Sequence, residues 1–198
     1  MATYASIKYD MDLSSNATGT GGMTLISTTT ASSSSTLDIT SGIDSTYKEY
    51  VFKFIDIHGS AQGSNYFQVN FRDGSSAFDA TKTTTLFRTY HFEDDSAAAL
   101  AYEEEHDLAQ STGALKIAQG ISTDNDHCTV GTLHLFDPSS TTFVKHFLSD
   151  TQTAHEDNAS YRWSVAGYCN VTAAIDGVQF SMSSGNIDSG TIKLYGVS

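Results

Sequence analysis

Residues 174–198 read AIDGVQFSMSSGNIDSGTIKLYGVS, and this stretch decides the fold. Val178, Phe180 and Met182 alternate with small or polar residues, and Ile192 and Leu194 do the same further on. Alternation with a period of two indicates a strand that buries one of its faces. The intervening SSGNIDSG is rich in residues that favour turns. The sequence therefore predicts two closing strands joined by a short loop, and the last of them needs a sheet in which to dock.

Outward from this stretch, the chain continues as short runs of β-forming residues separated by turns, without βαβ alternation. This pattern predicts an all-β protein, an antiparallel β-sandwich of jelly-roll type with at most one short helix. We expect a single domain over residues 23–198. The other runs expected to form strands are 23–30, 36–40, 51–58, 66–72, 83–92, 113–117, 128–136, 143–148 and 162–171.

The run VFKFIDIH at 51–58 is the clearest strand of the first half. Strict alternation places Val51, Lys53, Ile55 and Ile57 on one face and the remaining four residues on the other. Together with the closing strands, it gives the expected core and signature positions, which are Phe52, Phe54, Phe180, Ile192, Leu194, Tyr195 and Gly196.

Two further segments carry specific expectations. LHLFDPSSTTFVKHFL at 133–148 reads as a hairpin around DPSS, in which His134 and His146 would face each other across the strands. Residues 93–110 place Leu100, Glu104 and Leu108 at helical spacing, which indicates one short helix. An irregular loop is the alternative for this segment, because the apolar stripe is thin.

Residues 1–22 differ from the rest of the chain. Tyr4, Ile7 and Tyr9 are spaced apolar side chains, and the flexible SSNATGTGG follows them. One interpretation is a frayed terminus. The other is an assembly arm that becomes ordered on a neighbouring subunit, which the aromatic content favours.

The formal net charge of −13 limits the choice of partners. Nucleic acids and anionic membranes are both recognised through basic patches, and no such patch is visible, so we expect neither as a partner. No apolar run approaches the ~20 residues of a membrane span, and the first residues do not read as a signal peptide. In a reducing compartment, Cys128 and Cys169 are expected to be free thiols rather than a disulfide.

Few residues in the sequence are candidates for catalysis or metal binding. The acidic run from Glu103 to Asp107 includes His106 and raises a metal or acid–base hypothesis, but it lacks HExxH spacing, so a solvated acidic face is favoured. His155, Glu156 and Asp157 are expected to lie in a polar loop, and a solvated surface is favoured over a metal site there too. No nucleophile, phosphate-loop or dinucleotide motif is present, and we expect neither an enzyme nor a bound cofactor or metal. Tyr102, Glu104 and His106 are the candidate recognition loop.

Tyrosine and tryptophan are the richer supply of binding groups. These side chains serve core packing, protein interfaces and sugar stacking equally well, and core packing is expected for most of them. The candidate aromatic side chains are Tyr47, Tyr50, Tyr66, Tyr90, Tyr102, Tyr161, Trp163 and Tyr195.

Three segments carry a resemblance to a known family. GIDSTYKEYVFKFIDIH at 42–58, LFDPSSTTFVKHF at 135–147 and GYCNVTAAIDGVQFSMSSGNIDSGTIKLYGVS at 167–198 resemble structural proteins of tailed-bacteriophage virions. The resemblance implies a sandwich-fold virion component and transfers no catalytic residue.

We therefore expect a capsid decoration or cement protein, assembled in the host cytoplasm as a homotrimer that contacts the major capsid protein. The alternative is a tail-fibre or receptor-binding head that recognises a host surface glycan or protein. A polysaccharide-cleaving enzyme is a third and weaker hypothesis.

Overall fold

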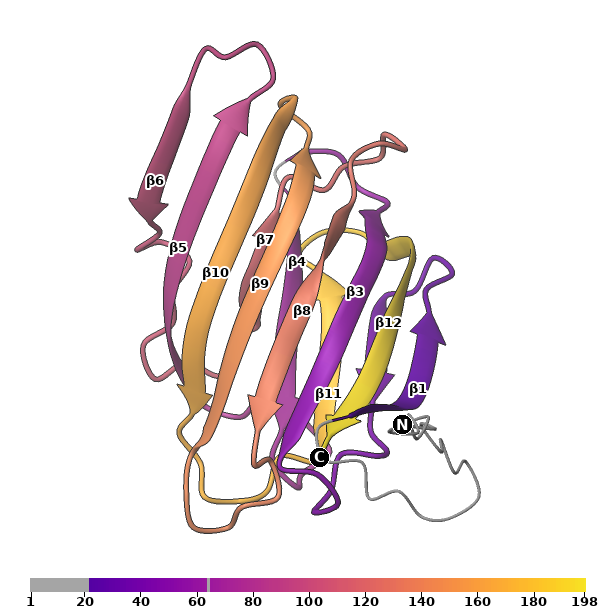
Figure 1. Cartoon of the computed structure of the whole chain (residues 1–198), viewed down its shortest axis with the longest axis vertical. Coiled ribbons are helices and arrows are strands. Elements are labelled where there is room, and N and C mark those ends of the chain that lie inside the picture. The colour runs from indigo at the N-terminus through magenta and orange to yellow at the C-terminus, as the bar shows by residue number, and fades with distance from the viewer. Residues whose placement is uncertain (1–21, 64) are drawn as a thin grey trace, which may run out of the picture.

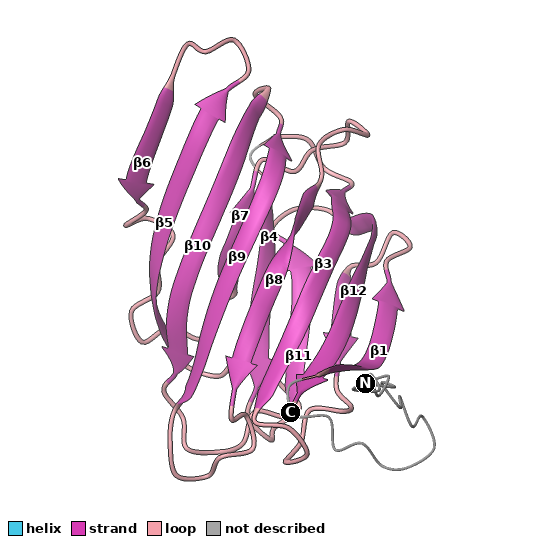
Figure 2. Cartoon of the chain, viewed as in Figure 1, coloured by secondary structure: helices cyan, strands magenta, loops and turns pink. Residues whose placement is uncertain are grey.

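The computed structural model describes residues 22–63 and 65–198, which form two antiparallel β-sheets packed face to face (Figures 1 and 2). Within these residues there is no helix, and hence none that could cross a membrane. The twelve strands are β1 (Met23–Thr30), β2 (Thr36–Ile39), β3 (Glu49–Gly59), β4 (Tyr66–Arg72), β5 (Lys82–Phe92), β6 (Ala98–Tyr102), β7 (Leu115–Gln119), β8 (Thr129–Phe136), β9 (Lys145–His155), β10 (Ala159–Cys169), β11 (Gly177–Met182) and β12 (Ile187–Val197).

The strand order confirms the antiparallel sandwich of jelly-roll type. The large sheet has the order β1-β12-β3-β8-β9-β10-β5-β6, and the small sheet has the order β2-β11-β4-β7. Among the described strands, only the steps from β5 to β6, β8 to β9 and β9 to β10 stay within one sheet; every other connection crosses to the opposite sheet. Repeated crossing between two sheets distinguishes a jelly roll from a simple meander. The two closing strands follow this rule, since β11 lies in the small sheet and β12 in the large one.

The expected strands are all present, and several are longer than the sequence indicated. β9, for example, continues to His155, far beyond the expected end at residue 148. The helix expected at 93–110 is wrong: residues 98–102 form β6, which pairs with β5 at the edge of the large sheet. A free sheet edge offers each residue of β6 a backbone partner on β5, which outweighs the weak helical stripe.

One cluster of apolar side chains fills the space between the sheets. At its centre Phe54 meets Phe67 and Phe180 edge-on, with ring centroids 5.2 and 5.3 Å apart. Phe52 also meets Phe180, at 5.6 Å. Such ring pairs add to the free energy gained from burial alone. The expected core positions Phe52, Phe54, Phe180, Ile192 and Leu194 are all buried.

Tyr195 and Gly196 have different surroundings. Tyr195 lies half-buried with the Lys53 amine 5.3 Å from its ring centroid. At Gly196 an added Cβ would lie 2.2 Å from the Tyr47 ring, so the ring occupies the space that a side chain would need. Tyr195 is therefore not part of the buried core, whereas Gly196 is buried.

A β-bulge in β3 overturns the expected facing of Ile57. Asp56 has a positive φ of 50°, and the pairing of β3 with β8 shifts between Phe54 and Ile57. The extra residue moves Ile57 onto the face that carries Phe54, where it is fully buried. Gly190 on β12 lies against the bulge with φ of 118°, and a Cβ there would lie 2.7 Å from the Asp56 carbonyl oxygen.

The β8–β9 hairpin is present, but its two histidines do not face each other. His134 pairs with Leu148, and His146 pairs with Tyr168 on β10. The register places Leu135 opposite Phe147, both buried on the inner face. Because burial of this pair sets the alignment, the histidines are offset by two residues.

Candidate functional site

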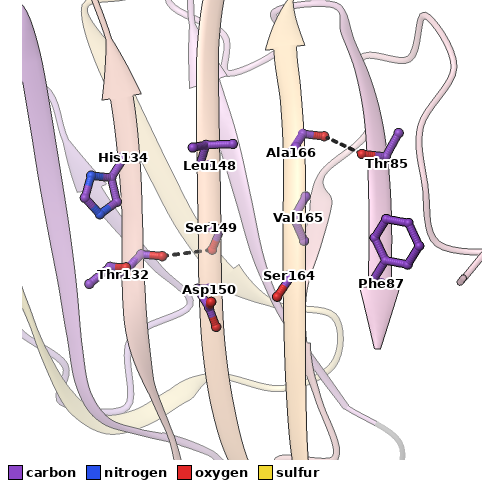
Figure 3. Close-up of a pocket in the computed structure, with 10 residues that line it drawn as sticks. All are labelled: Thr85, Phe87, Thr132, His134, Leu148, Ser149, Asp150, Ser164, Val165 and Ala166. Atoms are coloured by element: carbon purple, nitrogen blue, oxygen red, sulfur yellow. Dashed lines mark hydrogen bonds between the residues drawn. The ribbon is translucent and has the colours of Figure 1, made fainter. Parts of the chain in front are cut away.

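The large sheet carries a groove of about 500 Å³ on the side that points away from the small sheet (Figure 3). It crosses β8, β9, β10 and β5, the centre of the sheet in Figure 1. The residues that line it are Thr85, Phe87, Thr132, His134, Leu148, Ser149, Asp150, Ser164, Val165 and Ala166.

Side-chain size explains the groove. On β10, the outward residues Ser164 and Ala166 are small and form the floor. Ala166 pairs with Leu148 on one side, and Ser164 pairs with Phe87 on the other. Large side chains on β9 and β5 therefore rise on both sides of a row of small ones on β10. A second hollow of about 290 Å³ continues the groove along β10 past Gly167.

Charged groups at the groove are paired with one another. Arg162 donates from Nε to Asp150 Oδ1 at 2.8 Å and from Nη2 to Asp150 Oδ2, a bidentate pair at one end of the groove. His134 Nδ1 lies 2.6 Å from Glu49 Oε1 at the opposite wall. Both acidic side chains at the groove thus have a basic neighbour, in a chain whose formal net charge is −13.

Apolar side chains continue from the groove to the edge of the sheet. Phe87 is 49% exposed, Leu148 is 50% exposed, and Leu100 on edge strand β6 is 70% exposed. Tyr102 meets Phe87 edge-on with ring centroids 5.3 Å apart. Large apolar side chains that gather on one face are typical of a surface that contacts a partner. We call this region, from His134 through Leu148 and Phe87 to Leu100 and Tyr102, the outer face.

The structure separates the three residues of the expected recognition loop. Tyr102 lies on the outer face and donates to Asp107 Oδ2 at 2.5 Å, a bond that raises the pKa of its hydroxyl. Glu104 is exposed in the turn after β6. His106 turns the other way, and its Nε2 lies 3.1 Å from the Tyr66 hydroxyl. The three side chains therefore do not form one recognition surface.

His106 instead helps to close one side of the core. The large sheet has eight strands and the small sheet four; β7, at the edge of the small sheet, contacts β9 and β10, so the inner face of β5 extends beyond it. The His106 ring stacks on Trp163 with centroids 5.6 Å apart. Nearby, Glu103 pairs with Arg88 at 2.9 Å. The acidic run is thus only partly a solvated face, because some of its side chains cover the end of the sandwich.

His155 corrects another expectation. It is the last residue of β9 rather than part of a polar loop, and it is 3% exposed. Its ring stacks on Tyr161 with centroids 3.9 Å apart, and its Nδ1 accepts from the Asp157 backbone N–H at 3.1 Å. Burial lowers the pKa of His155. Across residues 22–63 and 65–198, no group of three or more His, Cys, Asp or Glu is placed to hold a metal ion.

Both cysteines are free thiols, as expected. Cys169 is buried, and this burial raises its pKa to about 12, whereas Cys128 is only partly buried. The arm residues Tyr4, Ile7 and Tyr9 lie outside the described residues.

Sequence reasoning did not identify the groove. In the sequence, the groove is indicated by one apolar residue in each of two outward-facing rows that are otherwise mostly polar. These residues are Leu148 on β9 and Phe87 on β5. The small residues Ser164 and Ala166 form the floor of a groove because β10 lies between β9 and β5, and the strand order is not visible in the sequence. Compared with protein-family models, curated proteins and solved structures, the chain has no match.

Proposed function

We propose that this chain is a structural protein of a tailed-phage particle, a capsid decoration protein whose outer face packs against other virion subunits. The observation that carries the proposal is the outer face itself, with half-exposed Phe87 and Leu148 beside paired charges. The resemblance of residues 42–58, 135–147 and 167–198 to virion proteins supports the same role.

Electrostatics supports the choice of this face for assembly. Two copies of a chain with net charge −13 repel each other at most orientations. On the outer face Arg162 compensates the charge of Asp150, and Glu49 is hydrogen-bonded to His134, so contact there brings few unpartnered carboxylates together. Burying Phe87 and Leu148 contributes roughly 25 cal/mol per Å² of apolar surface removed from water. We therefore place self-association, as a homotrimer, and contact with the major capsid protein at this face.

A second candidate function, recognition of a host surface glycan, has one observation in its favour. Tyr102 and Phe87 are exposed together at the edge of the large sheet. Exposed aromatic rings stack on sugars as readily as they pack against protein. In this case the protein would be a tail-fibre or receptor-binding head.

Copy number distinguishes the two functions. Quantitative mass spectrometry of purified virions gives the number of these chains per major capsid protein. A copy number comparable with that of the major capsid protein supports decoration. A number that fits only a few symmetric appendages contradicts it and supports the receptor-binding role. If virions lack the chain, both proposals are wrong.

The outer face is tested with Leu148→Glu. An unpaired charge in a protein interface is costly, so binding to undecorated particles should weaken by ~10-fold or more. Phe143→Glu is the matched control, because Phe143 is equally apolar and 69% exposed but lies in the β8–β9 loop. Equal loss in both variants, or in neither, would show that the outer face is not the interface.

A further inference from the structure

Two lysines are fully buried at the same end of the sandwich. Lys82 on β5 and Lys145 on β9 pair in register with Cys169 on the intervening β10. The Lys145 amine donates to two backbone carbonyl oxygens, those of Phe143 at 3.1 Å and Val171 at 3.0 Å. Lys82 has a different neighbour: besides the Ala80 carbonyl at 2.8 Å, its amine lies 2.5 Å from the side-chain oxygen of an asparagine. The two lysines therefore share burial but differ in chemistry.

That asparagine is Asn70 on β4, and its amide is held in one orientation. Oδ1 accepts from the Phe71 backbone N–H at 3.1 Å, and Nδ2 donates to the Thr112 carbonyl at 3.2 Å. The amide oxygen thus faces two donors, the amine of Lys82 and the N–H of Phe71. Because a C=O bond is about 1.23 Å long, Lys82 Nζ lies at most about 3.7 Å from Asn70 Cγ. This distance is within reach of the ~3–3.5 Å separation of reacting atoms in a near-attack arrangement, although the amine lies at the oxygen end of the C=O bond and has to shift over the face of the amide before it attacks Cγ.

We propose that Lys82 and Asn70 form an intramolecular isopeptide bond. The neutral amine of Lys82 attacks Asn70 Cγ and forms a new C–N bond. The bond from Cγ to Nδ2 breaks, and Nδ2 leaves as ammonia with one proton taken from the attacking nitrogen. A primary amine and a primary amide thus yield a secondary amide and ammonia, with no oxidant or reductant.

The surroundings supply what each step needs. Burial lowers the pKa of Lys82 to about 8, so an appreciable fraction of the amine is neutral and nucleophilic near neutral pH. The carboxylate of Asp79 acts in the opposite direction, since negative charge near the amine raises its pKa, but burial has the larger effect. The Phe71 N–H stabilises the negative charge that develops on Oδ1 during attack.

The same reasoning makes Lys145 an internal control. Its pKa is also lowered by burial, yet its acceptors are backbone carbonyls, where attack would have to break the chain. Of these two lysines, Lys82 is the one next to a side-chain amide that can release ammonia. The bond would join β4 of the small sheet to β5 of the large sheet, on either side of a connection that crosses between the two.

Intact mass spectrometry of the purified full chain tests the proposal. After incubation at mildly alkaline pH, the mass should be lower than the sequence mass by one ammonia molecule. Tryptic digestion then locates the bond. Cleavage after Arg72 separates residues 54–72 from residues 73–88, so the two peptides remain together only through Lys82 and Asn70. An unchanged mass, or an ammonia loss without the branched peptide, overturns the proposal.

Variants complete the test. Asn70→Ala and Lys82→Arg should both have the full sequence mass, whereas Lys145→Arg should still lose ammonia. Asn70 is only partly buried, so Asn70→Ala remains informative if Lys82→Arg fails to fold. Loss of ammonia in Asn70→Ala would show that another amide reacts and would overturn the assignment. This result is independent of any role in a virion.

Discussion

The two faces of strand β10 differ although one stretch of sequence forms both. Tyr161, Trp163 and Val165 point inward and are buried, whereas Ser164 and Ala166 point outward and form the floor of the groove. Inside, large side chains interlock with the opposite sheet. Outside, small side chains leave room between Leu148 and Phe87. The comparison shows that large side chains on one face stabilise the fold, and that small side chains on the other leave a groove.

The largest effect expected from this comparison is on the inner side. Phe180→Ala should lower the free energy of unfolding by about 3–5 kcal/mol, because it opens a cavity where the Phe52, Phe54 and Phe67 rings meet. Denaturant unfolding measures the loss. The control is Phe87→Ala on the outer face, which removes the same side chain from a half-exposed position and should cost under about 1 kcal/mol. Equal losses would contradict the assignment of the two faces.

The next effect concerns the bulge that moves Ile57 from the outer row to the inner one. Gly190→Ala should cost about 1–3 kcal/mol, because φ of 118° is strained for alanine and its Cβ would contact the Asp56 carbonyl. Gly74→Ala is the matched control: its φ is also positive, at 88°, but nothing lies within 4 Å of the added Cβ. Thermal melts should show a larger loss for Gly190→Ala, and a reversed order would show that the close approach has no effect.

A pH profile compares the histidines on the two faces of β9. Burial lowers the pKa of His155 below the value of about 6.5 expected in the unfolded chain, so the unfolded state binds more protons in the window below that pH. Stability should therefore fall as the pH drops from 7 through this window. His155→Gln should flatten the profile, measured by urea unfolding at several pH values. His146→Gln, on the exposed face of the same strand, should leave the slope in place.

The smallest effect is expected at the rim of the groove. Arg162→Ala removes the bidentate pair with Asp150, but both side chains are well exposed, and such pairs contribute at most about 1 kcal/mol. Urea unfolding should therefore show little change, while binding to particles should weaken because Asp150 is left unpaired at the proposed interface. A loss of stability as large as that of Phe180→Ala would indicate that the pair belongs to the fold.

The candidate surface was less predictable than the fold. Tyr102, Glu104 and His106 were expected to form one recognition loop, but His106, four residues after Tyr102, packs on Trp163 from a distant strand. The partners of His134 were also wrong, because a hairpin's register depends on which inward pairs are buried, here Leu135 and Phe147. Local spacing cannot report such choices, since they depend on strands far away in the sequence.

The sequence by itself determined the all-β class, nearly every strand and the buried face of the closing strands, because period-two alternation and turn residues act locally. Only the tertiary structure decided that residues 98–102 form an edge strand, that the bulge at Asp56 buries Ile57, and that Lys82 reaches Asn70. It also decided which strands lie side by side, and hence that the groove exists. The physical reason is that these features depend on contacts between segments distant in the chain, where burial outweighs local preference.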